Sequence, residues 1–496
     1  MQCLITAIVA VILLVGVASL CPRVCDCTNT SNGVNVDCSS RGLDRIPTHF
    51  PKNTYKLELQ YNDISVIENN TFNNLPNLQY LYLHSNKITS IKSDMFNNLT
   101  NLYRLWLDDN DISVIENNAF NNLPNLQYLN LEDNKITSIK SDMFNNLTKL
   151  YWLQLQNNNI LVIKNNTFNN LPTLYKLWLD HNDISVIENN AFNNLTSLQY
   201  LNLEHNKITS IKSDMFNNLR KLGQLELQEN DISVIENNTF NNLPNLQYLN
   251  LEDNKITSIK SDMFNNLKNL YRLELQYNDI SVIENNALSN LPDLHYLYLH
   301  SNKITSIKSD MFNNLTKLDQ LFMGNNPILF VSEHAFENLP NLTSLGFDMY
   351  CGGCDNVPFW RWLKLNQKFS TSITCHDFDR EYLSNLQLSN VTDCFGQYPI
   401  SPTSSNQSGL LTAGIACSIL LSIIFVVSFV VYRRFRLKKG KTVTVQISRI
   451  IFGNTENNTC NPRPVVTDQY DILNTTNMDV VSVVYPEKKK EQFMTI

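Results

Sequence analysis

The strongest constraint on the fold of this chain is an asparagine that returns every 24 residues. Between the leucines of the segment before it stand polar or aromatic residues, which is the period of a β-strand with one buried face. Twelve asparagines keep the spacing, and most follow Leu-x-x-Leu-x-Leu-x-x: Asn62, Asn86, Asn110, Asn134, Asn158, Asn182, Asn206, Asn230, Asn254, Asn278, Asn302 and Asn326. A fixed period of this length predicts a solenoid of stacked turns with a long parallel sheet.

Two further positions in each turn are predicted to be buried. The repeat asparagine should point its amide inward and satisfy backbone groups where the chain leaves each strand. Ten residues later stands a phenylalanine, with Leu288 as the exception, and we expect these rings to form an aromatic spine. They are Phe72, Phe96, Phe120, Phe144, Phe168, Phe192, Phe216, Phe240, Phe264, Phe312 and Phe336.

The turns alternate between two kinds. In acidic turns the asparagine precedes Asp-Ile-Ser-Val-Ile-Glu, and in lysine turns it precedes Lys-Ile-Thr-Ser-Ile-Lys; the turn of Asn158 breaks the alternation. Because equivalent positions of neighbouring turns lie on the order of 5 Å apart, alternation replaces repulsion with a ladder of acid–lysine pairs. We expect these exposed pairs to set the register of the turns rather than to stabilise them strongly.

Two apolar segments predict a single-pass topology. Residues 1–19 have the pattern of a secretory signal peptide. Residues 410–432 carry no charge and are long enough to span a bilayer once. The tail, residues 433–496, has 11 Lys and Arg against 6 Asp and Glu, a net charge of +5. Because the whole chain has a net charge of −7, residues 1–432 carry −12. The basic residues directly after the apolar segment predict a cytoplasmic C-terminus and an extracellular N-terminus at the plasma membrane.

Eight extracellular cysteines form two groups of four, one on each side of the repeats. They are Cys21, Cys25, Cys27 and Cys38, and Cys351, Cys354, Cys375 and Cys394. Even groups in an oxidising compartment indicate disulfides. Their place has a physical reason, because the end turns of a solenoid need caps. We divide the chain into a signal peptide (1–19), N-terminal cap (20–53), about 12 to 13 repeats (54–349), C-terminal cap (350–396), stalk (397–409), membrane span (410–432) and tail (433–496).

These features resemble the extracellular leucine-rich repeat family with cysteine caps. The residues that carry the likeness are the repeat itself, Cys-Pro-Arg-Val-Cys-Asp-Cys at 21–27, and Phe359, Trp360, Trp362 and Leu363 in the second cap. The family includes Toll-like receptor ectodomains, variable lymphocyte receptors and leucine-rich repeat adhesion proteins. The resemblance implies an α/β-type solenoid, a right-handed horseshoe with a concave parallel sheet. It also implies the disulfides Cys21–Cys27, Cys25–Cys38, Cys351–Cys375 and Cys354–Cys394.

The candidate binding site is the concave face. There the turns stop copying one another, whereas the convex segments are near-duplicates. Exposed aromatic side chains are enriched in binding hot spots. The predicted ligand-binding residues are Tyr80, Tyr82, Arg104, Trp106, Asp108, Tyr128, Trp152, Lys176, Trp178, Asp180, Tyr200, Glu226, Tyr248, Arg272, Tyr296 and Tyr298. Because acids outnumber bases on this face, we expect no nucleic acid there, but a basic or polar protein, or a glycan.

Predicted N-glycosylation sites support this choice of face. Within the repeats they lie seven, twelve or fifteen residues after the asparagine and avoid the strands. Bulky glycans there would coat the outer side and leave the concave sheet free. The sites are Asn29, Asn69, Asn98, Asn146, Asn165, Asn194, Asn237, Asn314, Asn341, Asn390 and Asn406.

The sequence thus predicts a single-pass cell-surface recognition receptor with an extracellular protein or glycan ligand, acting in innate immunity. Cell–cell adhesion, synaptic organisation and a non-signalling decoy are the alternatives. We find no catalytic motif and expect neither enzyme activity, nor a cofactor, nor a metal. His181 and His205 could bind metal or sense pH, but we interpret them as solvated side chains. Tyr470 with Leu473, and the C-terminus, are candidate contacts for a cytoplasmic adaptor.

Overall fold

The computed structural model describes residues 21–351, 354–366, 373–376 and 381–382. The predicted signal peptide, stalk, membrane span and tail lie outside these residues, as do Cys394, Asn390, Asn406, Tyr470 and Leu473. Among the described residues, no helix is long and apolar enough to cross a membrane.

The fold is a solenoid built on one long sheet. In space its strands follow the chain order, and β1–β2 and β26–β27 are antiparallel whereas all other neighbours are parallel. The strands are β1 (Asp26–Thr30), β2 (Gly33–Asp37), β3 (Thr54–Glu58), β4 (Tyr80–Tyr82), β6 (Arg104–Trp106), β8 (Tyr128–Asn130), β9 (Trp152–Gln154), β11 (Lys176–Trp178), β13 (Tyr200–Asn202), β15 (Gln224–Glu226), β17 (Tyr248–Asn250), β19 (Arg272–Glu274), β21 (Tyr296–Tyr298), β23 (Gln320–Phe322), β25 (Ser344–Met349), β26 (Ile373–Cys375) and β27 (Glu381–Tyr382). Each repeat strand pairs in register with the strand 24 residues later, as Arg104 does with Tyr128.

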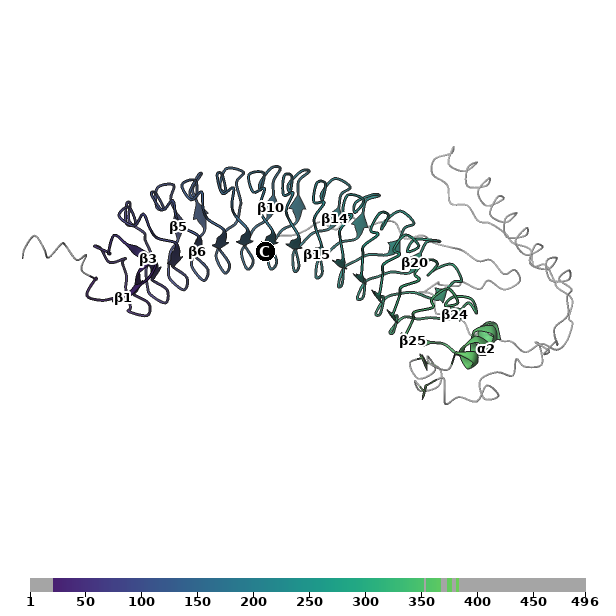
Figure 1. The fold of residues 1–496 in the computed structure, drawn as a ribbon. Coiled ribbons are helices and arrows are strands. Elements are labelled where there is room, and N and C mark those ends of the chain that lie inside the picture. Colours follow the sequence, from purple (N-terminus) through teal and green to yellow (C-terminus); the bar gives the residue numbers. More distant parts are fainter. Residues whose placement is uncertain (1–20, 352–353, 367–372, 377–380, 383–496) are drawn as a thin grey trace, which may run out of the picture. The chain divides into compact units, whose positions relative to one another are not determined.

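A second set of strands, each of two residues, follows the repeat asparagines. These are β5 (Ser90–Ile91), β7 (Val114–Ile115), β10 (Val162–Ile163), β12 (Val186–Ile187), β14 (Ser210–Ile211), β16 (Val234–Ile235), β18 (Ser258–Ile259), β20 (Val282–Ile283), β22 (Ser306–Ile307) and β24 (Phe330–Val331). They form five two-stranded parallel sheets. In Figure 1 the repeats follow an arc, and β6, β15 and β25 lie nearer its concave side than β10, β14 and β20.

The expected α/β class needs a correction, because the described repeats contain no helix. Their outer segments form turns in which asparagines adopt a left-handed backbone, such as Asn70 at φ 63° and Asn118 at φ 59°. L-residues cannot continue a right-handed helix through such a position, and asparagine adopts it more readily than most residues. The one described α-helix is α2 (Val357–Leu365), which follows the 3₁₀ turn η1 (Cys354–Asn356) in the C-terminal cap.

The repeat asparagines are buried and bind backbone, as predicted. In Asn86, Nδ2 donates to the carbonyls of Leu59 at 3.0 Å, Leu83 at 3.1 Å and His84 at 3.2 Å. Its Oδ1 accepts from the amide of Ile64 at 3.0 Å. One side chain thus joins two successive turns, and the same set of contacts recurs along the solenoid.

The predicted aromatic spine is also present. The rings stack on their neighbours 24 residues away at centroid distances of 6.0 to 6.4 Å, from Phe72 to Phe264 and again from Phe312 to Phe336. Leu288 interrupts the stack and is itself buried. Stacked rings and strand leucines together form one continuous core.

Acids and lysines alternate at two positions of the turns. Among the described residues, only the position directly after the repeat asparagine forms the expected acid–lysine pairs. Each lysine directly after a repeat asparagine pairs with the aspartate of the preceding turn, as Lys135 does with Asp111 at 2.5 Å and Lys207 with Asp183 at 2.6 Å. The glutamates behave differently, because Glu116 accepts a hydrogen bond from the backbone amide of Ser93 at 3.0 Å. Glu188, Glu236 and Glu284 make the equivalent contact.

We expect the lysine–aspartate pairs to contribute little stability. Asp111→Asn, Lys135→Gln and the double variant should each melt within about 2 °C of the wild type, because exposed ion pairs are screened by solvent. Thermal unfolding followed by circular dichroism measures this. A much larger loss in either single variant that the double variant reverses would show a strong coupling instead.

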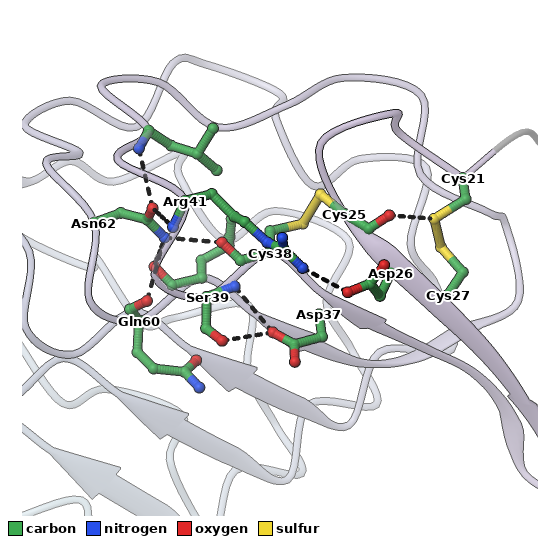
Figure 2. The surroundings of a disulfide bond; sticks show 12 residues. Cys21, Cys25, Asp26, Cys27, Asp37, Cys38, Ser39, Arg41, Gln60 and Asn62 are labelled. Atoms are coloured by element: carbon green, nitrogen blue, oxygen red, sulfur yellow. Dashed lines mark hydrogen bonds and ion pairs between the residues drawn. A yellow bond between two sulfur atoms is a disulfide. The ribbon is translucent and has the colours of Figure 1, made fainter.

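Both ends of the solenoid are capped. At the N-terminal end Cys21 is bonded to Cys27 and Cys25 to Cys38, the pairing that the resemblance implies (Figure 2). The cap joins the repeats through Asn62, whose Oδ1 accepts from the amides of Arg41 at 2.9 Å and Leu43 at 3.0 Å.

At the C-terminal end Cys351 is bonded to Cys375. Phe359 and Trp362, from α2, contact the last spine ring, Phe336. The expected partner of Cys354 lies outside the described residues.

Candidate functional site

The strand residues that flank each buried leucine form the exposed concave face. In β6, for example, Leu105 is buried while Arg104 and Trp106 are half-buried. All sixteen predicted ligand-binding residues lie on this face in three rows. At the first strand position are Tyr80, Arg104, Tyr128, Trp152, Lys176, Tyr200, Tyr248, Arg272 and Tyr296; at the third are Tyr82, Trp106, Trp178, Glu226 and Tyr298; two residues before the asparagine are Asp108 and Asp180.

The cations of this face lie over aromatic rings of their own and of adjacent strands. The guanidinium of Arg104 is 4.0 Å from the ring centre of Tyr128 and 5.8 Å from that of Trp106. The ammonium of Lys176 is 5.4 to 5.5 Å from Trp152, Trp178 and Tyr200. Such cation–π contacts hold aromatic and basic side chains as preformed clusters.

Further along the sheet, carboxylates replace the aromatic residues at the third strand position. Glu274, only 5% exposed, is bound by Arg272 at 2.6 Å and by the hydroxyl of Tyr248 at 2.8 Å. Glu226, 7% exposed, is bound by the amide of Gln224 at 2.6 Å. Burial, reinforced by Glu204 and Glu274, raises the pKa of Glu226 to about 7.

Five acids occupy the position two residues before the repeat asparagine, and we call them the acidic row: Asp108, Glu132, Asp180, Glu204 and Glu252. Burial is the main cause that raises the pKa of each of these carboxyls. Nearby acids of the same and neighbouring turns, up to two turns away, raise the pKa of Asp108, Glu132, Glu204 and Glu252 further. The row therefore concentrates incompletely solvated negative charge on the concave face.

One concave row was not among the predicted site residues. The residue directly before each repeat asparagine has a left-handed backbone, including large side chains such as Tyr61 at φ 58°, Glu229 at φ 53° and Tyr277 at φ 55°. Few non-glycine residues adopt this conformation. An aligned set of them therefore indicates a functional role for their exposed side chains. The sequence could have revealed this row, because each of its residues directly precedes a repeat asparagine.

His181 and His205 belong to this left-handed row. Their rings stack at 4.6 Å, and they contact Asp180 at 3.2 Å and Glu229 at 2.8 Å. Across the described residues, no cluster of His, Cys, Asp and Glu has the arrangement of a metal site.

The residues of the concave face do not vary equally in all turns, contrary to what the sequence prediction supposes. Every lysine turn begins its strand with tyrosine: Tyr80, Tyr128, Tyr200, Tyr248 and Tyr296. Residues 120–147 and 240–267, each containing a whole lysine-turn strand, are identical. The variation lies mainly in the strands that precede acidic turns, where Arg104, Lys176, Gln224 and Arg272 occupy one position.

The predicted glycosylation sites that the structure describes are all exposed: Asn29, Asn69, Asn98, Asn146, Asn165, Asn194, Asn237, Asn314 and Asn341. Those within the repeats lie outside the main-sheet strands, whereas Asn29 lies in β1 of the N-terminal cap. Asn69 and Asn98 thus occupy turns, on the far side of each repeat from its strand leucines. The concave face between the caps carries no such site.

Comparison with known proteins identifies the class that this fold and face define. The model for "BspA type Leucine rich repeat region" matches residues 113–247 in six copies. The model for "Leucine rich repeat" matches residues 52–112, 244–304 and 292–348. The chain belongs to the leucine-rich repeat family.

Curated relatives match only part of the chain. Leucine-rich repeat-containing protein 3 of Rattus norvegicus is 46% identical over 68 residues, 14% of this chain and 26% of that protein. Leucine-rich repeat-containing protein 3B of Homo sapiens is 40% identical over 85 residues, 17% of this chain and 32% of that protein. The chain thus spans about a quarter to a third of the length of these relatives.

Two solved structures share the fold. The complex of Toll with Spatzle from Drosophila has a TM-score of 0.56 at 20% identity, covering 65% of this chain and 43% of that one. The octameric complex of Latrophilin 3, Unc5D and FLRT2 has a TM-score of 0.52 at 24% identity, covering 75% and 100%. At this identity the likeness concerns the fold alone.

Proposed function

We propose that this protein is a cell-surface receptor that recognises an extracellular protein through the concave face of its repeats. The observation that carries the proposal is the contrast between a uniform scaffold and a varied, aromatic and charged face. Trp106 stacks on Tyr82 at 4.1 Å, and Trp178 lies against Lys176 and Tyr200. Rigid aromatic anchors held in place by neighbours lose little side-chain entropy when a ligand binds.

A defence role fits this pattern best. Near-identical lysine turns alternate with strands whose exposed residues differ, so new surfaces arise without disturbing the core. In the Toll–Spatzle complex, a molecular hub in Drosophila development and innate immunity, a chain of similar fold is in complex with Spatzle. We extend this to the present chain as a proposal, together with single-pass anchoring by residues 410–432.

A double substitution tests the concave site. Trp106→Ala with Trp178→Ala should weaken ligand binding at least about a hundredfold, because central aromatic anchors carry much of an interface's binding energy. The full-length chain, purified from a secretory host, is first screened against an array of secreted and cell-surface proteins. Each partner of the wild type is then titrated against the variant.

The matched control is Val114→Ala with Val186→Ala. These valines are exposed, and they belong to acidic turns that follow directly after the strands of the two tryptophans. They should leave the affinity unchanged within about twofold, because they lie off the main sheet. If the tryptophan variant bound its ligand as tightly as the wild type, the ligand site would not lie on the concave face.

A further inference from the structure

Among the described residues, no acid of the acidic row forms an ion pair with a lysine or arginine, unlike the aspartates that directly follow the repeat asparagines. The aspartates of the acidic turns are paired, as Asp111 is with Lys135. On the concave face Lys56 pairs with Glu58 and Arg272 with Glu274. In the described chain, neither Arg104 nor Lys176 forms an ion pair; both lie over aromatic rings. The bases of this face therefore leave the acidic row without an ammonium or guanidinium partner.

An independent observation concerns hydrogen-bond acceptors in the same positions. Within the described residues, one oxygen of Asp108, Gln156, Asp180, Gln228 and Gln276 is buried and receives no hydrogen bond. Gln156 is only 8% exposed and lies in line between Glu132 and Asp180, one turn from each. Gln276 is 4% exposed and donates its own amide to Glu274 at 2.8 Å, so its oxygen is left as an acceptor.

A rotation of the side chain would let donors from outside reach these acceptors. A buried acceptor without a donor is unfavourable by about 1 to 3 kcal/mol. The terminal torsions of Asp and Gln side chains are broad, so a modest rotation turns such an oxygen toward an approaching donor. A ligand rich in N–H donors and positive charge would satisfy both the acceptors and the carboxylates.

We infer that the acidic row, with the glutamines aligned with it, binds a lysine- and arginine-rich segment of a protein ligand that lies across the strands. This inference rests on the proposed concave-face function and names the chemistry of its ligand. Trp106 and Trp178 each stand two residues before an acid of the row, so that aromatic anchors and charge contacts serve one surface. Lysine and arginine carry several donors and no acceptor, the complement of a row that offers only acceptors.

Acidification should weaken this contact. The groups that face the row are His84, Asp109 and Asp133 near Asp108; His181 and Glu229 near Asp180 and Glu204; and Asp253, Glu229 and Glu274 near Glu252. When pH falls, carboxyls with raised pKa take up protons first and lose their attraction for a cation.

The test uses a defined probe, a fluorescent lysine homopeptide of about ten residues, at about 0.15 M salt to screen non-specific attraction. Fluorescence anisotropy measures its binding to the purified full-length protein, with a glutamate homopeptide as the negative probe. The row variant combines Asp108→Asn, Glu132→Gln, Asp180→Asn and Glu204→Gln. It should bind the lysine peptide at least about tenfold more weakly than the wild type.

The matched control removes the same number of acidic residues elsewhere: Asp111→Asn, Asp183→Asn, Asp231→Asn and Asp279→Asn. It should keep the affinity within about threefold, because those aspartates are paired with lysines. Lowering the pH from about 7.5 to about 5.5 should weaken binding by the wild type more than binding by the row variant. Absence of lysine-peptide binding, or equal losses in the row and control variants, would overturn the inference.

Two further measurements separate the causes of failure. The row variant should melt no lower than the wild type, because burial disfavours the charges that it removes; a lower melting temperature would attribute its loss to misfolding and overturn the inference. A partner protein that the row variant still binds, but the Trp106 and Trp178 variant does not, would refute the cationic ligand and keep the concave-face function. A partner that both variants bind as tightly as the wild type does would refute both proposals.

Discussion

Asn230→Ala is expected to destabilise the solenoid by about 4 kcal/mol, because several buried backbone groups lose their partners at once. Nδ2 of Asn230 donates to the carbonyls of Leu203 at 3.0 Å, Leu227 at 3.2 Å and Gln228 at 3.2 Å. Its Oδ1 accepts from the amide of Ile208 at 3.0 Å. The substitution therefore weakens the joint between two turns in the middle of the repeats, where each turn is held only by its neighbours.

Two measurements check this prediction. Thermal or denaturant unfolding gives the loss of stability, and hydrogen exchange should show that the amide of Ile208 loses its protection. The control is Asn242→Ala in the same turn, whose exposed side chain donates to Asn217 at 2.6 Å. It should change the free energy of unfolding by less than about 1 kcal/mol. An unprotected Ile208 amide in the wild type, or equal losses in both variants, would contradict the role assigned to the repeat asparagines.

Glu226→Gln is expected to stabilise the protein at neutral and alkaline pH. The folded state raises the pKa of Glu226 from 4.5 to about 7, so its ionised form is disfavoured by folding. Each pKa unit corresponds to about 1.4 kcal/mol, which gives an order of 3 kcal/mol for a fully ionised Glu226 at pH about 8. Because the folded pKa lies above the unfolded one, wild-type stability rises as the pH falls through about 7 and gains nothing more below about 4.5.

The pH profile distinguishes this effect from an ordinary packing change. The difference in stability between the Gln variant and the wild type should be largest near pH 8 and should vanish only below about pH 4.5, where the wild-type carboxyl is protonated in both the folded and the unfolded state. Glu229→Gln, three residues later and exposed beside His205, serves as the control and should change stability only slightly. A pH-independent difference for Glu226→Gln would show that its carboxyl is not buried as described.

The sequence alone was sufficient for the scaffold, because the scaffold depends on local and periodic features. A 24-residue period with alternating leucines specifies the buried face of each strand, and it places Asn86 and Phe96 inside every equivalent turn. The cap cysteines could be paired from the resemblance, as Cys25–Cys38 shows. The α/β class that the resemblance implied is wrong for the described repeats, because left-handed asparagines in their outer segments prevent a continuous helix.

The partners of charged side chains could not be obtained in the same way. Glu116 and Lys92 stand at equivalent offsets of adjacent turns, yet Glu116 binds the backbone amide of Ser93. Which group a charged side chain binds depends on the direction of that side chain and on the distance between two turns. Neither follows from spacing in the chain.

The sequence by itself determined which residues form the concave face, because strand periodicity and the repeat length together dictate which side chains share a side. Only the tertiary structure decided which charged side chains of that face are buried and which lie over aromatic rings. Arg104 and Lys176 lie over rings contributed by strands one turn away, and Glu226 is only 7% exposed. The physical reason is that burial and cation–π contacts arise between turns, where the atoms of separate repeats first come within reach of one another.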